Sequence, residues 1–140
     1  MKNTKIRIII SATVLIALSI LAIRWLTLKI NSDFATEALL EFHYEDMNVS
    51  TAITDEEDIV ILKQLLSGRS YFRDSLHCGF TTDISITMTN GRKNIIFCPA
   101  NDGCQLLRIG TSGRYIETSY EAITKLHEIL SKYGMVFPCV

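Results

Sequence analysis

The sequence has no Cys-X-X-Cys pair, although it contains four cysteines. Structural zinc sites usually hold the metal between such closely spaced cysteines, and thiol oxidoreductases use the same motif to lower the pKa of one thiol. The missing pair argues against both classes. A metal-binding or thiol-redox protein is kept as the alternative function, because the four cysteines and His77 supply enough ligand atoms.

Catalytic and cofactor-binding motifs are also missing. The histidines His43, His77 and His127 form no recognisable catalytic set with serine and acidic residues. No helix is predicted to begin directly after Gly110–Gly113, as a phosphate-binding loop requires, and Asn101–Gly103 lacks the other spaced acids of a calcium loop. We therefore predict no enzyme activity, no cofactor and no metal ion.

Basic residues are scarce beyond residue 30. Five of the 14 Lys and Arg residues lie within residues 1–30, which contain no acid, so all 15 Asp and Glu residues lie in residues 31–140. The formal net charge of -1 thus combines a basic N-terminal segment with an acidic remainder. Proteins that bind nucleic acids neutralise phosphates with clustered Lys and Arg, so we predict no nucleic-acid partner.

Residues 1–30 have the arrangement of a signal anchor, in which basic residues precede the uncharged run Ile8–Ile23. As a helix, this run spans about 24 Å, less than the roughly 30 Å of a hydrocarbon core, and apolar flanking residues extend it. We predict a transmembrane helix that contacts the cell membrane through residues 6–28. The alternative is a cleaved signal peptide that ends near Ala17-Leu18-Ser19. The charge bias predicts a single-pass protein whose C-terminal domain lies outside the cytoplasm, in the periplasm or the extracellular space.

Residues 31–38 are predicted to form a linker, and residues 39–140 one α+β domain. Capping boxes at Thr54–Glu57 and Thr118–Glu121 precede apolar residues at helical spacing, which predicts helices over residues 55–67 and 119–133. Period-two patterns predict a mostly antiparallel sheet of four to five strands, with both helices on its apolar face. Two strands are predicted on either side of Asn90-Gly91, further strands at 105–109 and 114–118, and one or two strands within 39–44 and 49–53.

Two turns set the expected register of this sheet. Asn90-Gly91 is typical of a two-residue type I′ hairpin. The resulting pairs are Met88 with Lys93, Ile86 with Ile95, and Ile84 with Phe97. A turn at Thr111-Ser112 places Leu107 opposite Ile116, on the same apolar face.

The even number of cysteines behind an export signal predicts two disulfides. A loop over Pro99–Gly103 would place Cys98 directly opposite Cys104, which favours a bridge between them. Cys78 would then pair with Cys139. The two other connectivities stay open.

A resemblance to known proteins rests on three segments: CGF at residues 78–80, FCPANDGC at 97–104 and YGMVFPCV at 133–140. The chain resembles small bacterial exported or membrane-anchored proteins of uncharacterised function, a resemblance that implies no enzyme activity and no binding residues. In layout it is also similar to immunity proteins that protect bacteria from envelope-acting bacteriocins. We predict a membrane-anchored extracytoplasmic binding module, an inhibitor or immunity-type protein that captures a protein or peptide partner. A third hypothesis is a structural envelope protein without a soluble ligand.

Overall fold

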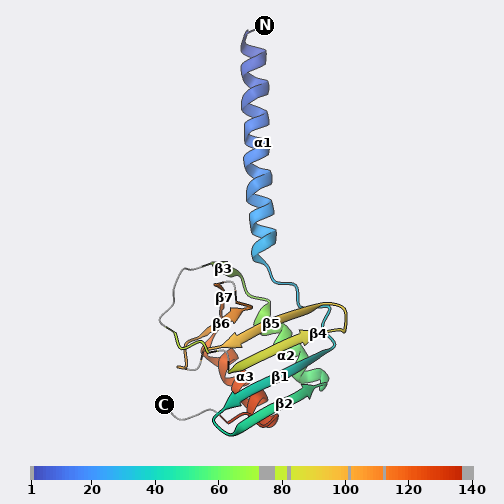
Figure 1. Ribbon diagram of the computed structural model, residues 1–140. Coiled ribbons are helices and arrows are strands. Elements are labelled where there is room, and N and C mark those ends of the chain that lie inside the picture. Colours follow the sequence, from blue (N-terminus) through green and yellow to red (C-terminus); the bar gives the residue numbers. More distant parts are fainter. Residues whose placement is uncertain (1, 73–77, 82, 101, 112, 137–140) are drawn as a thin grey trace.

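The structure is a computed structural model that describes residues 2–72, 78–81, 83–100, 102–111 and 113–136. Its helices and strands follow one another along the chain as shown in Figure 1. They are α1 (Lys2–Leu28), β1 (Glu37–Tyr44), β2 (Met47–Ile53), α2 (Glu56–Leu66), β3 (Ser70–Phe72), β4 (Ile84–Thr89), β5 (Asn94–Pro99), β6 (Leu106–Ile109), β7 (Arg114–Glu117) and α3 (Tyr120–Lys132).

α1 projects from the rest of the chain as a single long helix (Figure 1). Its residues 10–24 are exposed, whereas Ile30, just after its end, is buried in the core. Within the described ranges, no helix combines the length and the apolar character needed to cross a membrane. The predicted transmembrane helix, and with it the single-pass location outside the cytoplasm, is therefore wrong. The uncharged run lies between Arg7 and Arg24, which limits it to about 24 Å against the roughly 30 Å of a hydrocarbon core.

The described residues form one antiparallel sheet of seven strands in the order β2-β1-β4-β5-β6-β7-β3. The prediction of four to five strands with two helices after a transmembrane helix is therefore wrong. One added strand is β3, which lies in a segment without a strand pattern and pairs with β7. The first two predicted strands are separate, so β2 adds a further strand beside β1.

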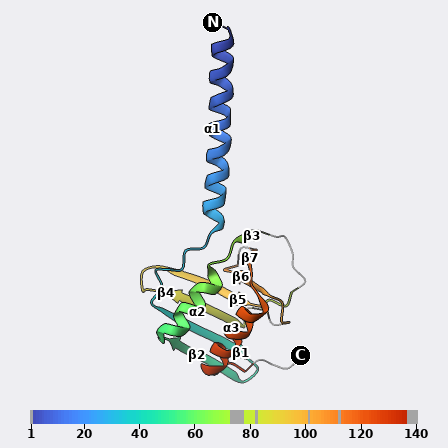
Figure 2. The ribbon, with the colours of Figure 1, turned by 180° about the vertical axis from the view of Figure 1, so that it is seen from behind.

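α2 and α3 pack on the same face of the sheet, as the two opposite views in Figures 1 and 2 show. Both helices lie where the sequence predicts them, but each begins one residue later than predicted, and each cap lies one residue after the predicted Thr54 or Thr118. Asp55 caps α2 by accepting the N–H groups of Glu57 and Asp58. Ser119 caps α3 by accepting the N–H of Ala122 at 3.2 Å. These caps satisfy N–H groups that have no partner within the helix.

The core fills the space between the sheet and these two helices. Alternate residues of each strand point into it, so that Ile84, Ile86 and Met88 of β4 are buried while their neighbours are partly exposed. The large side chains that are almost completely buried are Leu40, Phe42, Ile53, Leu62, Leu66, Ile84, Ile86, Met88, Phe97, Leu107, Ile116 and Leu126.

The β4–β5 pairing differs from the predicted register by two residues. The observed pairs include Met88 with Ile95 and Ile86 with Phe97. The turn is longer than expected because the Asn90 side chain accepts the N–H groups of both Arg92 and Lys93. A shift of two residues keeps every side chain on its predicted face. The predicted pair of Leu107 with Ile116 is confirmed.

A buried carboxylate joins the start of α2 to the end of α3. Asp58 is 7% exposed, and its Oδ2 lies 2.8 Å from Lys132 Nζ and 2.9 Å from the Tyr133 hydroxyl. Lys132 Nζ also lies 3.4 Å from the Asp55 carboxylate. Hydrogen bonding to Asp58 is the main factor that raises the pKa of Lys132. The two helices are therefore held together by hydrogen bonds to a buried carboxylate as well as by apolar packing.

Candidate functional site

The face of the sheet opposite the helices is partly covered by residues 78–81, which we call the covering segment. Arg108 of β6 donates from Nη2 to the Thr81 carbonyl at 2.9 Å, and its guanidinium lies 5.4 Å from the centre of the Phe80 ring. The Phe80 ring is in turn 5.4 Å from that of Tyr115 in β7. The covering segment is therefore tied to β6 and β7 by polar and aromatic contacts.

Cys98 lies beneath the covering segment. Its Sγ is 3.6 Å from the Thr81 carbonyl, and the residue is 4% exposed. Burial raises the pKa of the Cys98 thiol, although the charge of Arg108 acts in the opposite direction. A buried neutral thiol is unreactive, so Cys98 is best described as part of the core.

Cys78, Asp102 and Cys104 form a compact group, which we call the thiol cluster. Their ligand atoms all lie within 4.8 Å of one another. Asp102 holds the cluster together, since its two carboxylate oxygens accept the N–H of Gly79 at 2.9 Å and that of Cys104 at 3.1 Å. The hydrogen bond from Gly79 is the main factor that lowers the pKa of Asp102. Hydrogen bonding with Cys78 raises the pKa of Cys104 to about 12.

The structure arranges the cysteines differently from the predicted register. Cys98 lies opposite Arg108 rather than Cys104, because the loop between β5 and β6 extends to residue 105. The neighbour of Cys104 is Cys78. Cys78, Cys98 and Cys104 are not bridged to one another in this structure, and Cys139 and His77 lie outside the described residues.

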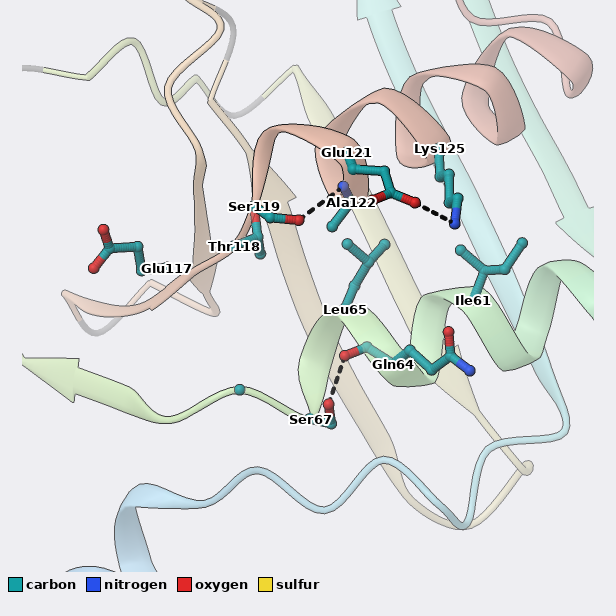
Figure 3. A pocket seen from close by; sticks show the side chains of 11 residues that line it. Ile61, Gln64, Leu65, Ser67, Glu117, Thr118, Ser119, Glu121, Ala122 and Lys125 are labelled. Atoms are coloured by element: carbon teal, nitrogen blue, oxygen red, sulfur yellow. Dashed lines mark hydrogen bonds and ion pairs between the residues drawn. The ribbon is translucent and has the colours of Figure 1, made fainter.

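A hollow of about 320 Å³ lies between the end of α2 and the start of α3 (Figure 3). Several of its polar side chains already have local partners. Ser119 caps α3, Ser67 donates to the Gln64 carbonyl at 2.7 Å, and Glu121 lies 3.0 Å from Lys125. These groups stabilise helix ends and do not converge on a common point, so the hollow does not provide a catalytic set.

β2 lies at one edge of the sheet, where half of its backbone donors and acceptors have no strand to pair with among the described residues. Among the residues that the structure describes, β2 pairs only with β1. His43 of β1 donates its N–H to the Asp83 carbonyl on the β4 side, so its neighbour Phe42 faces β2. The backbone N–H and C=O groups of Val49, which pairs with Phe42, are therefore directed towards β1. The alternate residues of β2, whose backbone N–H and C=O groups therefore point away from the sheet, are Asn48, Ser50 and Ala52.

The β2 edge lacks the features that usually prevent strand addition. Its sequence, MNVSTAI, contains neither a charged residue nor proline, and Asn48, Ser50 and Ala52 are exposed. The opposite edge, β3, has only three residues. Sequence reasoning includes residues 49–53 in a strand but does not place that strand at an edge of the sheet. The absence of charged residues from this segment was the signal that could have indicated an open edge.

Acidic residues flank the β2 edge at both ends. Glu45 and Asp46 form the turn that precedes β2. Asp55, the cap of α2, and Glu56 and Glu57 in its first turn follow β2. Tyr44 and Met47, beside the same turn, are 37% and 39% exposed. The edge thus combines uncharged backbone groups in the middle with negative charge at its ends.

In the part of the chain that the structure describes, the β2 edge and the thiol cluster both offer groups to another molecule. The resemblance to small bacterial exported proteins stays a prediction, since the chain matches no protein-family model and is significantly similar to no curated protein and to no solved structure.

Proposed function

We propose that this protein is a binding module that captures an extended segment of a protein or peptide partner along β2. The observation that carries the proposal is the open, uncharged edge of seven residues from Met47 to Ile53. An extended segment added to such an edge gains main-chain hydrogen bonds, and side chains at alternate positions give specificity. The backbone groups of Asn48, Ser50 and Ala52 would hold the segment.

The charge around the edge favours a particular kind of segment. Acidic residues at both ends of β2 attract Lys or Arg, and like charges in a partner would repel them. The exposed apolar side chains of Tyr44 and Met47 offer a contact beside the turn. We therefore propose a β-prone, uncharged segment with basic flanking residues.

An inhibitor or immunity-type role fits this mode of binding. Main-chain pairing can hold a segment of a partner protein in a conformation that is extended and no longer available to its own fold or target. This role is proposed on the same edge and needs no second site.

Ser50→Pro tests the proposal. Proline removes the outward N–H of Ser50 and places its ring on the free edge, while the ladder between β1 and β2 uses the N–H groups of the neighbouring residues. Peptides with basic ends are selected from a random displayed library on the immobilised chain, and their affinities are measured by fluorescence anisotropy. We expect Ser50→Pro to weaken them by at least about tenfold, which corresponds to roughly 1.4 kcal/mol.

Ser50→Ala is the matched control, since it removes the hydroxyl group and keeps the N–H. It should bind the same peptides with nearly unchanged affinity. Thermal unfolding of both variants checks that the fold is retained. Equal binding of the peptides to the wild-type and Ser50→Pro proteins would contradict the proposal.

A further inference from the structure

We propose that Cys78 and Cys104 are joined by a disulfide that fastens the covering segment to the loop between β5 and β6. This bridge is independent of the proposed partner site, because that site is the edge strand β2, which is separated from β5 and β6 by β1 and β4. It also differs from the pairing that the sequence favours, in which Cys104 pairs with Cys98.

The geometry brings these two thiols together and keeps Cys98 apart. The sulfur atoms of Cys78 and Cys104 lie within 4.8 Å of each other, so a movement of about 3 Å or less brings them to the disulfide bond length. Cys98 Sγ instead contacts the carbonyl oxygens of Thr81 and Pro99, beneath the covering segment. Cys78 and Cys104 are both partly exposed, so an oxidant can reach them.

The contacts of Asp102 hold the two loops in place for this bond. One oxygen accepts the N–H of Gly79, next to Cys78, and the other accepts the N–H of Cys104 itself. Gly103 has φ of +75°, a conformation that glycine adopts without strain, and it turns the chain between Asp102 and Cys104. The loop geometry is therefore set by hydrogen bonds that do not depend on the sulfur atoms.

The oxidation is an exchange with a small-molecule disulfide such as glutathione disulfide. One cysteine thiolate attacks the disulfide and forms a mixed disulfide, releasing one glutathione thiol. The second cysteine then attacks the protein sulfur of that intermediate and releases the second glutathione thiol. The two cysteines lose two electrons and two protons, and glutathione disulfide gains both.

A metal site is the competing interpretation of the thiol cluster. Structural zinc requires four ligands and thiolates, whereas the cluster offers two thiols and one carboxylate whose oxygens already accept N–H groups. The raised pKa of Cys104 disfavours the thiolate that a metal needs.

Peptide mapping of the full chain tests the bridge. The protein is equilibrated in a buffer of reduced and oxidised glutathione, free thiols are blocked with iodoacetamide, and the chain is cut with trypsin and with a protease that cleaves before Asp. This places each cysteine on its own peptide, within residues 74–82, 94–101, 102–108 and 133–140. We expect peptides 74–82 and 102–108 to appear joined, lighter by two hydrogen atoms than their sum, and to separate after reduction.

Two variants and one metal control complete the test. Cys78→Ser should leave Cys104 fully alkylated, whereas Cys98→Ala should leave the bridge between Cys78 and Cys104 in place. A bridge from Cys78 or Cys104 to a different cysteine would overturn the proposal, as would full alkylation of both in the oxidising buffer. It would also be overturned if Zn²⁺ alone protected both cysteines from alkylation and no joined peptide formed.

Discussion

Phe97→Ala is expected to lower the free energy of unfolding by about 3 to 5 kcal/mol. Phe97 is completely buried, and its strand, β5, is central in the sheet. It lies opposite Ile86 on one side and Ile109 on the other, so removal of its ring leaves a cavity between two strand pairs. Neighbouring side chains can fill such a cavity only in part, and the lost contacts add to the loss of apolar burial.

Ile96→Ala is the matched control for this substitution. Ile96 precedes Phe97 on the same strand, points to the opposite face and is 44% exposed. Its truncation should change the free energy of unfolding by only about 1 kcal/mol or less. Urea unfolding of both variants gives the two values. A larger loss for Ile96→Ala than for Phe97→Ala would mean that the strand faces the core with its other side.

Asp58→Ala should lower the free energy of unfolding by about 2 to 3 kcal/mol. Asp58 Oδ2 accepts hydrogen bonds from the Lys132 ammonium group and the Tyr133 hydroxyl. The Lys132 side chain is 53% exposed, so the ion pair is screened by water and contributes little by itself. Most of the loss therefore comes from the two hydrogen bonds at the buried carboxylate and from the weakened contact between α2 and α3.

Glu57→Ala is the comparison for Asp58→Ala. Glu57 lies in the same first turn of α2 but is exposed, so its truncation should change the free energy of unfolding by about 0.5 kcal/mol. Tyr133→Phe removes one of the two hydrogen bonds and should fall between them, at about 1 kcal/mol. Chemical denaturation at neutral pH measures all three. Equal stability of Asp58→Ala and Glu57→Ala would show that the junction of the helices does not depend on this carboxylate.

The helices were predictable because their signals are local. The capping boxes at Thr54–Glu57 and Thr118–Glu121 and apolar residues at helical spacing are sufficient to specify α2 and α3 to within a residue or two. The apolar faces of β4 to β7 were predictable for the same reason, because alternation along a strand needs no knowledge of its neighbour. The pair of Leu107 with Ile116 followed from that alternation and a short turn.

The exact register and the number of strands depended on information that lies outside each segment. Asn90 can close a two-residue turn or, with its side chain bonded to Arg92 and Lys93, a longer one. β3 has three residues and becomes a strand only because β7 is there to pair with it. Hydrophobic periodicity indicates neither the length of the turn at Asn90 nor the formation of β3.

The candidate sites were the least predictable part. Cys104 meets Cys78 instead of Cys98 because the loop after β5 extends to residue 105, and loop length is not specified by the residues within it. Residues 49–53 were predicted to belong to one or two strands with residues 39–44, but the position of β2 at an edge depends on the order of all seven strands in the described residues. A strand pattern predicts that pairing occurs and leaves the partner undetermined.

Amide hydrogen exchange of the free protein, resolved by residue, tests the central claim that β2 offers an open edge. The N–H groups of Val49 and Thr51 point at β1 and should exchange slowly, whereas that of Ser50 points away from the sheet. We predict that Ser50 exchanges faster than Thr51 by a factor on the order of a hundred. Equal protection of Ser50 and Thr51 would contradict the account, because the edge would then already be covered.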